Sequence, residues 1–577
     1  MPIDYSQAAA TTFRVADATI AERVFMKRLG IGLLLLLIAA YVGWQNRINL
    51  LVWGAPRIQA IVNPIPPNVP TEWTQGPETA TTSPAERPPN IILILADDMG
   101  FNDISLYNGG AADGTLQTPN IDALAHEGVV FNNGYAANAV CAPSRATILT
   151  GRYSTRFGFE FTPFPKAGAT IFRWMEELEP SLLPSMINEE NLATLPDMQD
   201  LGMPPSEETI AETLKDAGYY TAHIGKWHLG SSGGMRPEDQ GFDDSLYMKG
   251  TLYLPEDDPG VVNAKREQSG IERMVWAMSR YMATFNGSEP FEPDGYLTDY
   301  YTNEAIKVIE NNRNQPFFLY LAHWGIHNPL QATKEDYEAL SHIEDHHLRV
   351  YAAMIRALDR SVARINDALE EHGLSDNTLV IFTSDNGGAN YIGLPDINQP
   401  YRGWKLSHFE GGTHVPFMAK WPAKIAPGSV FDDPIHHIDL FHTIAGAAGT
   451  AVPQDRKLDG VDLLPYISGE IAEAPHETLF WRQGYQQTVL HQGWKLIRTD
   501  LPDNKRWLFH LAVDPTEQNN LAASRSQKVA TLEALLDGHN QDQAESLWPS
   551  VAQIPILIDK HEGQPYVEGD EYLYWPN

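Results

Sequence analysis

One cysteine lies in a segment whose residue types and spacing could do chemistry. Cys141 is the only cysteine among 577 residues, and Ala-Pro143-Ser144-Arg145 follows it, so an intrachain disulfide is excluded. A proline and a hydroxyl are typical of a helix start, and Gly151 is typical of a helix end. The thiol would then lie at a helix N-terminus, where unpaired N–H groups favour an anion. Arg145, one turn further on, would return to the same place.

The cysteine alone supports a plainer interpretation, because a lone cysteine is usually a small buried hydrophobe. Other chemically capable residues weigh against it. Asp97 and Asp98 follow the apolar run 91–96, and Asp385 and Asn386 follow the apolar run 378–383. Either pair, taken alone, would be interpreted as part of a solvated loop or turn. Parallel α/β sheets, however, bind ligands at the carboxyl ends of their strands, and oxygen donors suit calcium or magnesium.

Basic side chains also follow apolar runs. Lys226 and His228 come after the run 219–224, and because they are two residues apart they share a face of an extended segment. His327 follows the run 317–322. Taken one at a time, a lysine or a histidine would by default be a surface residue.

The motifs together resemble the type I sulfatases of the alkaline phosphatase superfamily, arylsulfatases among them. The similar stretches are Cys141-Ala-Pro-Ser-Arg with Leu149-Thr-Gly-Arg, Gly225-Lys-Trp-His-Leu-Gly, Asp385-Asn-Gly-Gly, and Arg402-Gly-Trp-Lys with Glu410-Gly-Gly-Thr-His. They fall within roughly residues 90–525. The resemblance implies a sulfuric ester hydrolase that acts on a carbohydrate or aryl sulfate.

The resemblance also implies roles for individual residues. A formylglycine-generating enzyme would oxidise Cys141 to formylglycine (3-oxoalanine), whose hydrate is the nucleophile. One Ca²⁺, or less readily Mg²⁺, would be held by Asp97, Asp98, residue 141, Asp385 and Asn386. The other implied catalytic residues are Arg145, Lys226 and Lys405 on the sulfate, His228 as the base that releases it, and His327 on the leaving-group side.

Two other functions stay open from the sequence. One is a phosphoester or phosphonate hydrolase, because such relatives in the superfamily share the metal site and the formylglycine. The other is an inactive, membrane-tethered binding protein with an unmodified cysteine.

The remaining histidines receive weaker interpretations. His323 is a second-choice candidate for the leaving-group side. We expect the histidines at 342, 346 and 347 to lie on a polar surface, because they lack the helical spacing and the third ligand of a metal site. His414 receives no role, because relatives often have arginine there. The histidines at 437 and 442 are expected to be structural.

The composition limits the function classes. The net charge of −33 and a pI near 4.9 argue against nucleic-acid binding, which needs a basic face. The length allows a large core and more than one domain.

The N-terminus predicts a membrane protein. Residues 1–28 would be cytoplasmic, and the uncharged apolar run 29–46, preceded by Lys27 and Arg28, would be a transmembrane signal anchor. A cleaved signal peptide is the close alternative. Either one places the rest outside the cytoplasm, in a periplasmic, extracellular or lumenal compartment. The proline-rich stretch 47–89 is predicted to be a stiff, extended linker.

The rest of the chain alternates strand and helix patterns. Among them we predict a strand over 129–135, a helix capped at 206–208, and a long helix whose apolar stripe is formed by residues 348, 351, 355, 358, 362, 365 and 369. We expect an α/β catalytic domain over 90–470, with a large, mostly parallel sheet flanked by helices as in alkaline phosphatase. A C-terminal α+β subdomain with a small antiparallel sheet would cover 471–577. An apolar stretch without clear periodicity, 157–205, would be an insertion over the active-site mouth or an ordinary packed excursion. Sulfated polysaccharide would be the common substrate outside the cytoplasm, and this insertion also allows an amphipathic or lipid-like sulfate ester.

Overall fold

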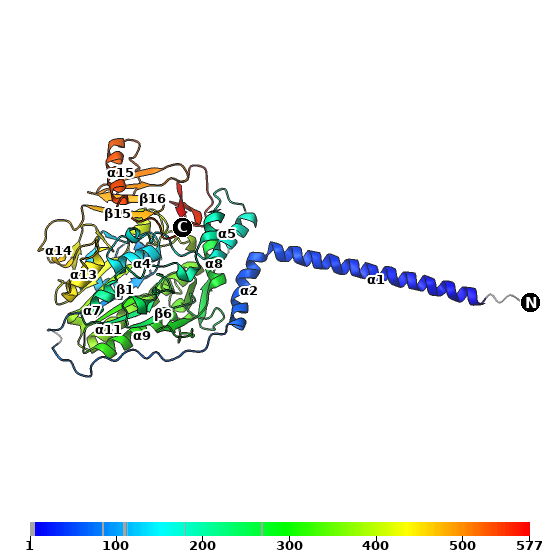
Figure 1. The fold of residues 1–577 in the computed structure, drawn as a ribbon, viewed down its shortest axis with the longest axis horizontal. Helices are drawn as coiled ribbons and strands as arrows, with labels where there is room; N and C mark the ends of the chain where they lie inside the picture. The colour runs from blue at the N-terminus through cyan, green and yellow to red at the C-terminus, as the bar shows by residue number, and fades with distance from the viewer. Residues whose placement is uncertain (1–5, 84–85, 108–110, 112, 179, 267–268) are drawn as a thin grey trace, which may run out of the picture.

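A nine-stranded sheet organises the computed structural model, which describes residues 6–83, 86–107, 111, 113–178, 180–266 and 269–577 (Figure 1). The strand order is β13-β2-β12-β11-β1-β9-β5-β6-β8. Five of its neighbouring pairs run parallel, so the predicted mostly parallel sheet is confirmed. The strands are β1 (Asn90–Ala96), β2 (Val129–Phe131), β5 (Tyr220–Gly225), β6 (Asp244–Met248), β8 (Ala283–Phe285), β9 (Phe317–Ala322), β11 (Thr378–Ser384), β12 (Phe417–Lys420) and β13 (Ser429–Phe431).

The central strand β1 explains where the site lies. All of its residues are buried, as its continuous apolar sequence predicts for a strand covered on both faces. β9 and β11 pair with it in parallel, with Ile91 opposite Phe318 and Leu379. The carboxyl ends of three neighbouring strands therefore meet at one edge of the sheet.

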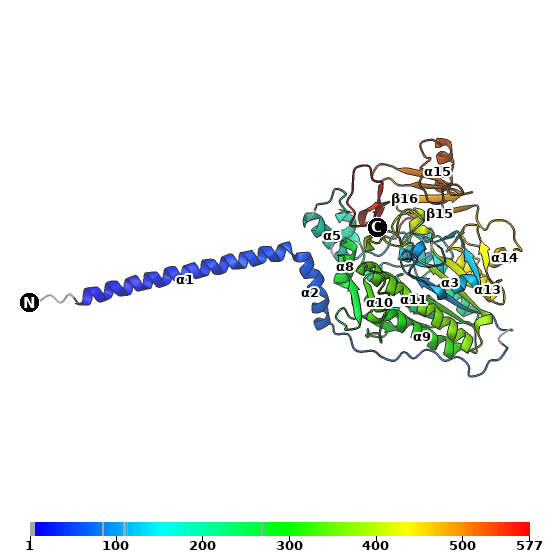
Figure 2. The same ribbon diagram turned by 180° about the vertical axis from the view of Figure 1, so that it is seen from behind.

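Helices cover both faces of the sheet. In Figure 1 the nearer helices include α4 (Cys141–Thr150), α7 (Ile210–Asp216) and α13 (Asp439–Ala448), which contact one another. Figure 2 shows α3 (Pro119–His126), α9 (Leu297–Asn312) and α11 (His346–Glu371) on the other side. α11 presents the apolar stripe that the sequence predicted, and the stripe is buried.

The C-terminal part contains the predicted small antiparallel sheet. It is formed by β15 (Thr478–Gln483), β16 (Gln486–His491), β17 (Trp494–Arg498) and β18 (Arg506–His510), with α15 (Ser526–Asn540) against it. A further sheet joins distant segments, because β19 (Ala552–Leu557) pairs with β20 (Tyr572–Pro576) and with β4 (Met186–Ile187) of the 157–205 insertion. The tail and the insertion are therefore one structural unit.

The N-terminal helix is longer than the predicted span. α1 covers Ser6–Gln45, and its stretch Glu22–Gln45 is long and apolar enough to cross a membrane. Figure 1 shows α1 leaving the globular part as a single rod. The described side chains of this stretch are almost all exposed, so the helix is not part of the core.

The prediction of an extended linker over 47–89 is wrong for its first part. Residues Arg47–Val62 form α2, which packs against α8 (Gly270–Met278). The apolar residues of this stretch outweigh its proline, because they give a helix one face to bury. The remainder is irregular but attached: Trp73 is buried, its ring nitrogen donates to Glu304 Oε2 at 2.7 Å, and the Thr74 amide donates to Asp244.

Two local predictions also need correction. The helix expected to be capped at 206–208 begins instead at Ile210, where Thr209 and Glu212 form a capping box. The strand expected over 129–135 is two short strands, β2 and β3 (Gly134–Tyr135). In the insertion, α5 (Lys166–Leu178) and α6 (Glu189–Thr194) form where the sequence shows no clear period.

Candidate active site

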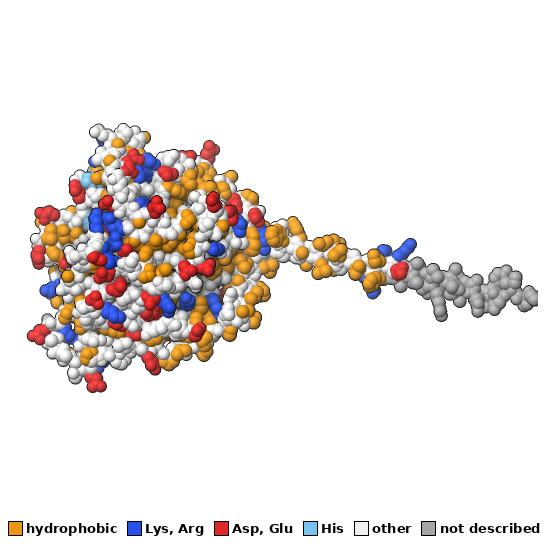
Figure 3. Space-filling model, in the orientation of Figure 1, with side chains coloured by type: hydrophobic (Ala, Val, Ile, Leu, Met, Phe, Trp, Pro, Cys, Tyr) orange, Lys and Arg blue, Asp and Glu red, His pale blue; other side chains and the backbone are white. Residues whose placement is uncertain are grey.

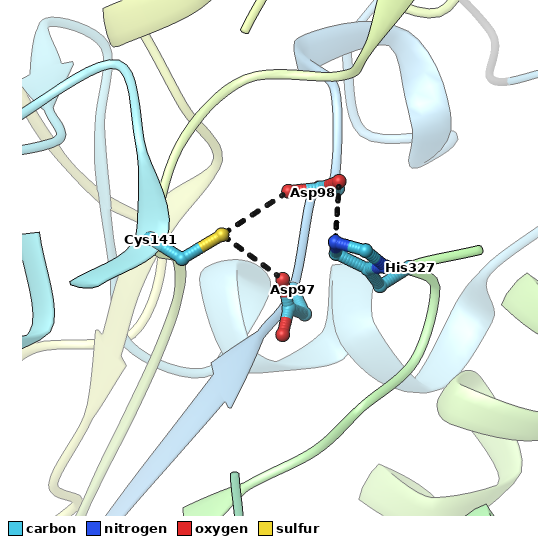
Figure 4. Close-up of side chains that lie close together, drawn as sticks. All are labelled: Asp97, Asp98, Cys141 and His327. Carbon is cyan, nitrogen blue, oxygen red and sulfur yellow. Dashed lines mark hydrogen bonds and ion pairs between the residues drawn. The ribbon is translucent and has the colours of Figure 1, made fainter. Parts of the chain in front are cut away.

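The single cysteine lies at the first position of α4, directly after the extended residue Val140. Its sulfur is 3.6 Å from Asp97 Oδ1 and 3.7 Å from Asp98 Oδ1 (Figure 4). Gly151 ends the helix in the left-handed conformation, as predicted. The structure thus places the thiol at a helix N-terminus and against two carboxylates.

The two aspartates leave β1 through a tight turn. Asp98 has φ +60°, a conformation that aspartate tolerates better than most residues. The following Gly100 approaches the backbone so closely that a Cβ would lie 2.1 Å from the Ile397 carbonyl oxygen. The strand end and this close packing together aim both carboxylates at Cys141.

A buried arginine joins three of the motifs. Arg145 donates from Nε to Asp385 Oδ2 at 2.8 Å, from Nη2 to Asp97 Oδ2 at 3.1 Å, and from Nη1 to the Lys226 carbonyl oxygen at 2.9 Å. Arg145, Asp97 and Asp385 are fully buried. The guanidinium balances two carboxylates that would be costly to bury alone.

Two lysines flank the aspartates. Lys226 Nζ lies 2.7 Å from Asp97 Oδ2, and Lys405 Nζ lies 2.6 Å from Asp98 Oδ1. Lys405 Nζ is also 3.4 Å from His327 Nε2. His327 Nε2 is 3.4 Å from Asp98 Oδ2, as Figure 4 shows. A strip of positive charge therefore borders Cys141.

The second strand end supplies the predicted amide and acid. The Asp98 amide donates to Asp385 Oδ1 at 3.3 Å, and Asn386 Nδ2 donates to Asp98 Oδ1 at 2.9 Å. The other amide atom, Asn386 Oδ1, is buried with no hydrogen-bond partner in the described part of the chain. A buried oxygen that lacks a donor calls for a cation or a water molecule.

This donor set fits a hard cation. Ligand atoms of Asp97, Asp98, Cys141 and His327 all lie within 4.8 Å of one another. The carboxylates and the free Asn386 oxygen are the donors that Ca²⁺ prefers, and an oxygen at residue 141 would extend the same set.

The environment makes the thiol itself a poor nucleophile. Burial, together with the nearby Asp385 carboxylate, raises the pKa of the Cys141 thiol well above its ordinary value. A thiol nucleophile needs the opposite environment, one that stabilises the thiolate. The side chains around position 141 therefore do not by themselves stabilise a thiolate there.

His228 lies at the cavity with Cys141, and its Nδ1 is buried without a hydrogen-bond partner among the residues described. Burial and the charge of Lys226 hold the pKa of His228 well below its usual range, so the ring is neutral. His323 lies apart, since its ring bonds to Ser361. His437 contacts the hydroxyls of Ser144 and Thr383, which is a structural position.

Sequence reasoning missed two aromatic residues of the site. Tyr391 OH is 3.1 Å from both Asp98 Oδ2 and Lys405 Nζ. The Trp324 ring stacks on His327 at 4.0 Å and lies under Lys226 Nζ at 4.7 Å. Tyr391 does not directly follow a strand and belongs to no recognisable spacing pattern. Trp324, in contrast, directly follows His323 and could have been considered as a candidate site residue.

A cavity of about 820 Å³ opens outward from Cys141. Its inner end is lined by Lys226, His228, His327 and Lys405. Its outer walls come from the insertion, α8 and the C-terminal tail. The prediction that the insertion borders the active-site mouth is therefore confirmed.

Comparisons with known proteins agree with this site. The family model "Sulfatase" matches residues 89–450, and the model "N-sulphoglucosamine sulphohydrolase, C-terminal" matches residues 404–542. Human N-acetylgalactosamine-6-sulfatase is 31% identical over 82% of this chain and 89% of its own length. Mouse steryl-sulfatase is 32% identical over 72% of each chain. The crystal structure of Ps i-CgsB with k-i-k-neocarrahexaose superposes with a TM-score of 0.66 and 28% identity, covering 80% of this chain and 95% of that one.

The fold and these matches together define the class of protein: a hydrolase with a mixed α/β fold, whose site lies at the carboxyl edge of a mostly parallel sheet. The chain belongs to the sulfatase family of the alkaline phosphatase superfamily, and it is a sulfuric ester hydrolase.

Proposed function

We propose that the chain hydrolyses a carbohydrate or aryl sulfate with a formylglycine at position 141 and one Ca²⁺ ion beside it. The observation that carries this is the position of Cys141, at a helix N-terminus and within 4 Å of two carboxylates. Asp97, Asp98, residue 141, Asp385 and Asn386 would hold the ion. When present, the hydrated aldehyde supplies a hydroxyl nucleophile and the ion draws electron density from the sulfate oxygens.

The side chains around this position can do the remaining work. Lys226 and Lys405 line the cavity with Cys141 and pair with Asp97 and Asp98, and they would bind the sulfate oxygens as charge develops on them. Arg145, buried behind the aspartates, keeps Asp97 and Asp385 in place. His327 and Lys405 lie together on one side of the cavity, on the side proposed for the departing alcohol. Burial lowers the pKa of His327, so the charged Lys405 is the readier proton donor, and His327 would donate only after it has gained a proton.

His228 is proposed as the base that accepts a proton when sulfate is released. Its neutral ring and its free buried Nδ1 support this role, because only an unprotonated imidazole can accept a proton. The formylglycine-generating enzyme is the proposed partner during maturation.

We also propose that α1 anchors the chain, with the catalytic domain outside the cytoplasm. Lys27 and Arg28 on the N-terminal side of the apolar stretch support this orientation. A signal peptide remains the alternative. Detection of Met1-containing peptides in the membrane fraction of the native host would support the anchor, and a mature N-terminus beyond residue 46 would favour cleavage.

The test of the chemistry compares matched aryl sulfate and aryl phosphate esters. Protein in which residue 141 is shown to be formylglycine should release inorganic sulfate with the larger kcat/KM. The variant Cys141→Ala should release none. A clear preference for the phosphate or phosphonate ester would instead assign the chain to the phosphoester branch of the superfamily.

A further inference from the structure

The active-site cavity is charged at one end and apolar along the rest. Beyond the basic side chains near Cys141, the insertion contributes Phe164, Phe172 and Met198 to its walls. A site that recognises a sugar needs several polar groups to bind its hydroxyls. The lining also contains polar side chains, such as Gln199, Ser231 and Lys249, but most of its surface is apolar.

The outer walls also include segments that the family models do not cover. Ile554 of β19 and Trp575 of β20 line the cavity, and both lie beyond residue 542, where the second family match ends. β4 of the insertion pairs with β19, which fixes the tail beside the insertion. The part of the apolar wall that the tail contributes therefore lies outside the family matches, whereas the insertion and α8 lie within the residues that the model "Sulfatase" matches.

Helix α8 connects this cavity to the N-terminal helices. Met274 and Met278 on one side of α8 line the cavity. Trp276, on another side, belongs to a cluster against which Val52 of α2 packs. A second cavity of about 370 Å³ shares Phe172 and other lining residues with the first.

This second cavity reaches α2 itself, because Ile48 is among its lining residues. α2 begins two residues after α1 ends, so an α1 that spans a membrane places α2 at the lipid surface. Leu50, Trp53, Ile58 and Ile61 are exposed on α2. Figure 3 shows hydrophobic side chains gathered on the side of the globular part from which α1 leaves.

The charge pattern of the N-terminal segment fits the same surface. The chain carries a net charge of −33, yet it has no Asp or Glu between Glu22 and Glu72. Of the two basic residues of α2, Arg47 is buried and paired with Glu177, whereas Arg57 is exposed and its guanidinium lies 4.9 Å from the centre of the Trp53 ring. Apolar, aromatic and basic side chains without acidic ones are typical of a helix that lies in a membrane interface.

We propose that the outer cavity binds the apolar alcohol part of an amphipathic sulfate ester, which the enzyme draws from the lipid surface beside α2. This rests on the proposed function. The lysines near Cys141 bind the anionic head, and the apolar walls bind the tail that leads away from it. The charge and the apolar lining of the cavity complement the two ends of such a molecule.

The test uses a series of 4-alkylphenyl sulfates from methyl to decyl, each below its micelle concentration. The leaving group keeps the same acidity along this series, so only burial of the chain changes. For wild-type protein with confirmed formylglycine, kcat/KM should rise with chain length, by up to about fourfold per methylene, which corresponds to ~0.8 kcal/mol per buried CH₂.

A charged side chain in the wall should remove this dependence. Met278→Glu changes a cavity-lining residue that is 45% exposed, and Met186→Glu is the matched control, 37% exposed and outside both cavities. We expect M278E to lower kcat/KM at least about tenfold for the decyl ester and to leave the methyl ester unchanged. M186E should behave as wild type.

The outcomes separate the two proposals. If wild type turns over the methyl ester with no dependence on chain length, the outer cavity does not bind the tail and this inference is wrong. If no sulfate ester in the series is turned over, the proposed function itself fails.

A second arm tests the lipid source with full-length protein in phosphatidylcholine vesicles. An ester with an octadecyl chain, which leaves a bilayer slowly, is placed either in the vesicles that carry the enzyme or in separate vesicles. The initial rate should be clearly higher when enzyme and ester share a bilayer, and equal initial rates would overturn the lipid source.

Discussion

Lys495 on β17 is the cation of a buried cluster between the catalytic domain and the C-terminal sheet. Its Nζ lies 2.6 Å from Glu410 Oε1 and 3.0 Å from Glu517 Oε1, and all three side chains are buried. His414 Nδ1 lies 2.8 Å from Glu410 Oε2. The variant Lys495→Met keeps most of the volume and removes the charge. Loss of one partner from such a group costs about 3–5 kcal/mol of unfolding free energy.

The loss should also depend on pH. Burial and the neighbouring Glu410 raise the pKa of Glu517 to about 7 even with Lys495 present, and its removal raises this pKa further. A carboxyl whose pKa is raised on folding contributes stability that is full below its unfolded pKa, near 4.5, and that is lost as the pH rises through the folded value. K495M should therefore lose more stability at about pH 8 than at about pH 5.

The assay is urea unfolding followed by tryptophan fluorescence, since Trp494 and Trp507 lie in the same sheet. The double variant Lys495→Met/Glu517→Gln is the control, because it removes one of the two buried carboxylates and leaves only Glu410, beside His414. It should recover part of the loss at high pH and depend on pH less than K495M does. A loss below about 1 kcal/mol at pH 8, or an equal loss in the double variant, would refute the reasoning.

Three further predictions concern the site and its surroundings. Tyr391→Phe removes a hydroxyl 3.1 Å from both Asp98 and Lys405, and kcat/KM for an aryl sulfate should fall about tenfold or more, since hydrogen bonds to charged groups are worth ~1.5–3 kcal/mol; unchanged kinetics would contradict this. Burial raises the pKa of Asp103 to about 8, so the stability of the wild-type protein should fall as the pH rises from about 4 to 8. The variant Asp103→Asn lacks this titration and should become more stable than wild type over that range, as measured by thermal unfolding. Parallel pH profiles of the two proteins would argue against this prediction. Asn386→Ala should raise the Ca²⁺ concentration needed to restore activity after EGTA treatment about tenfold, and the same Ca²⁺ dependence as wild type would remove Asn386 from the proposed shell.

Much of the site could be predicted because its residues lie in short motifs at strand ends. Asp97 and Asp385 follow apolar runs that are buried on both faces, and parallel pairing brings such ends together. Arg145 follows Cys141 by one helical turn, a spacing that needs no tertiary information. The large sheet and the C-terminal hairpins could also be predicted, because their strand patterns lie in short local stretches of sequence.

The parts that could not be predicted depend on contacts between distant segments. Tyr391 reaches Asp98 from the short 3-10 helix η6 (Asn390–Ile392), and it belongs to none of the sequence motifs. The apolar cavity needs the insertion, α8 and the tail together, and no one of these segments indicates that the other two lie beside it. α2 was taken for a linker because prolines dominate the stretch that includes it, whereas its helix is fixed by packing against α8.

The central claim is that residue 141 acts as an aldehyde beside a divalent ion. Mass spectrometry of the peptide that contains this residue, in protein from the native host, tests this claim. Aryl sulfate turnover and metal content are measured on the same protein. We predict that the peptide has the mass of CHO in place of CH₂SH, and that turnover rises in proportion to the converted fraction. A peptide that retains the thiol, in protein that turns over at its full rate, would contradict the account.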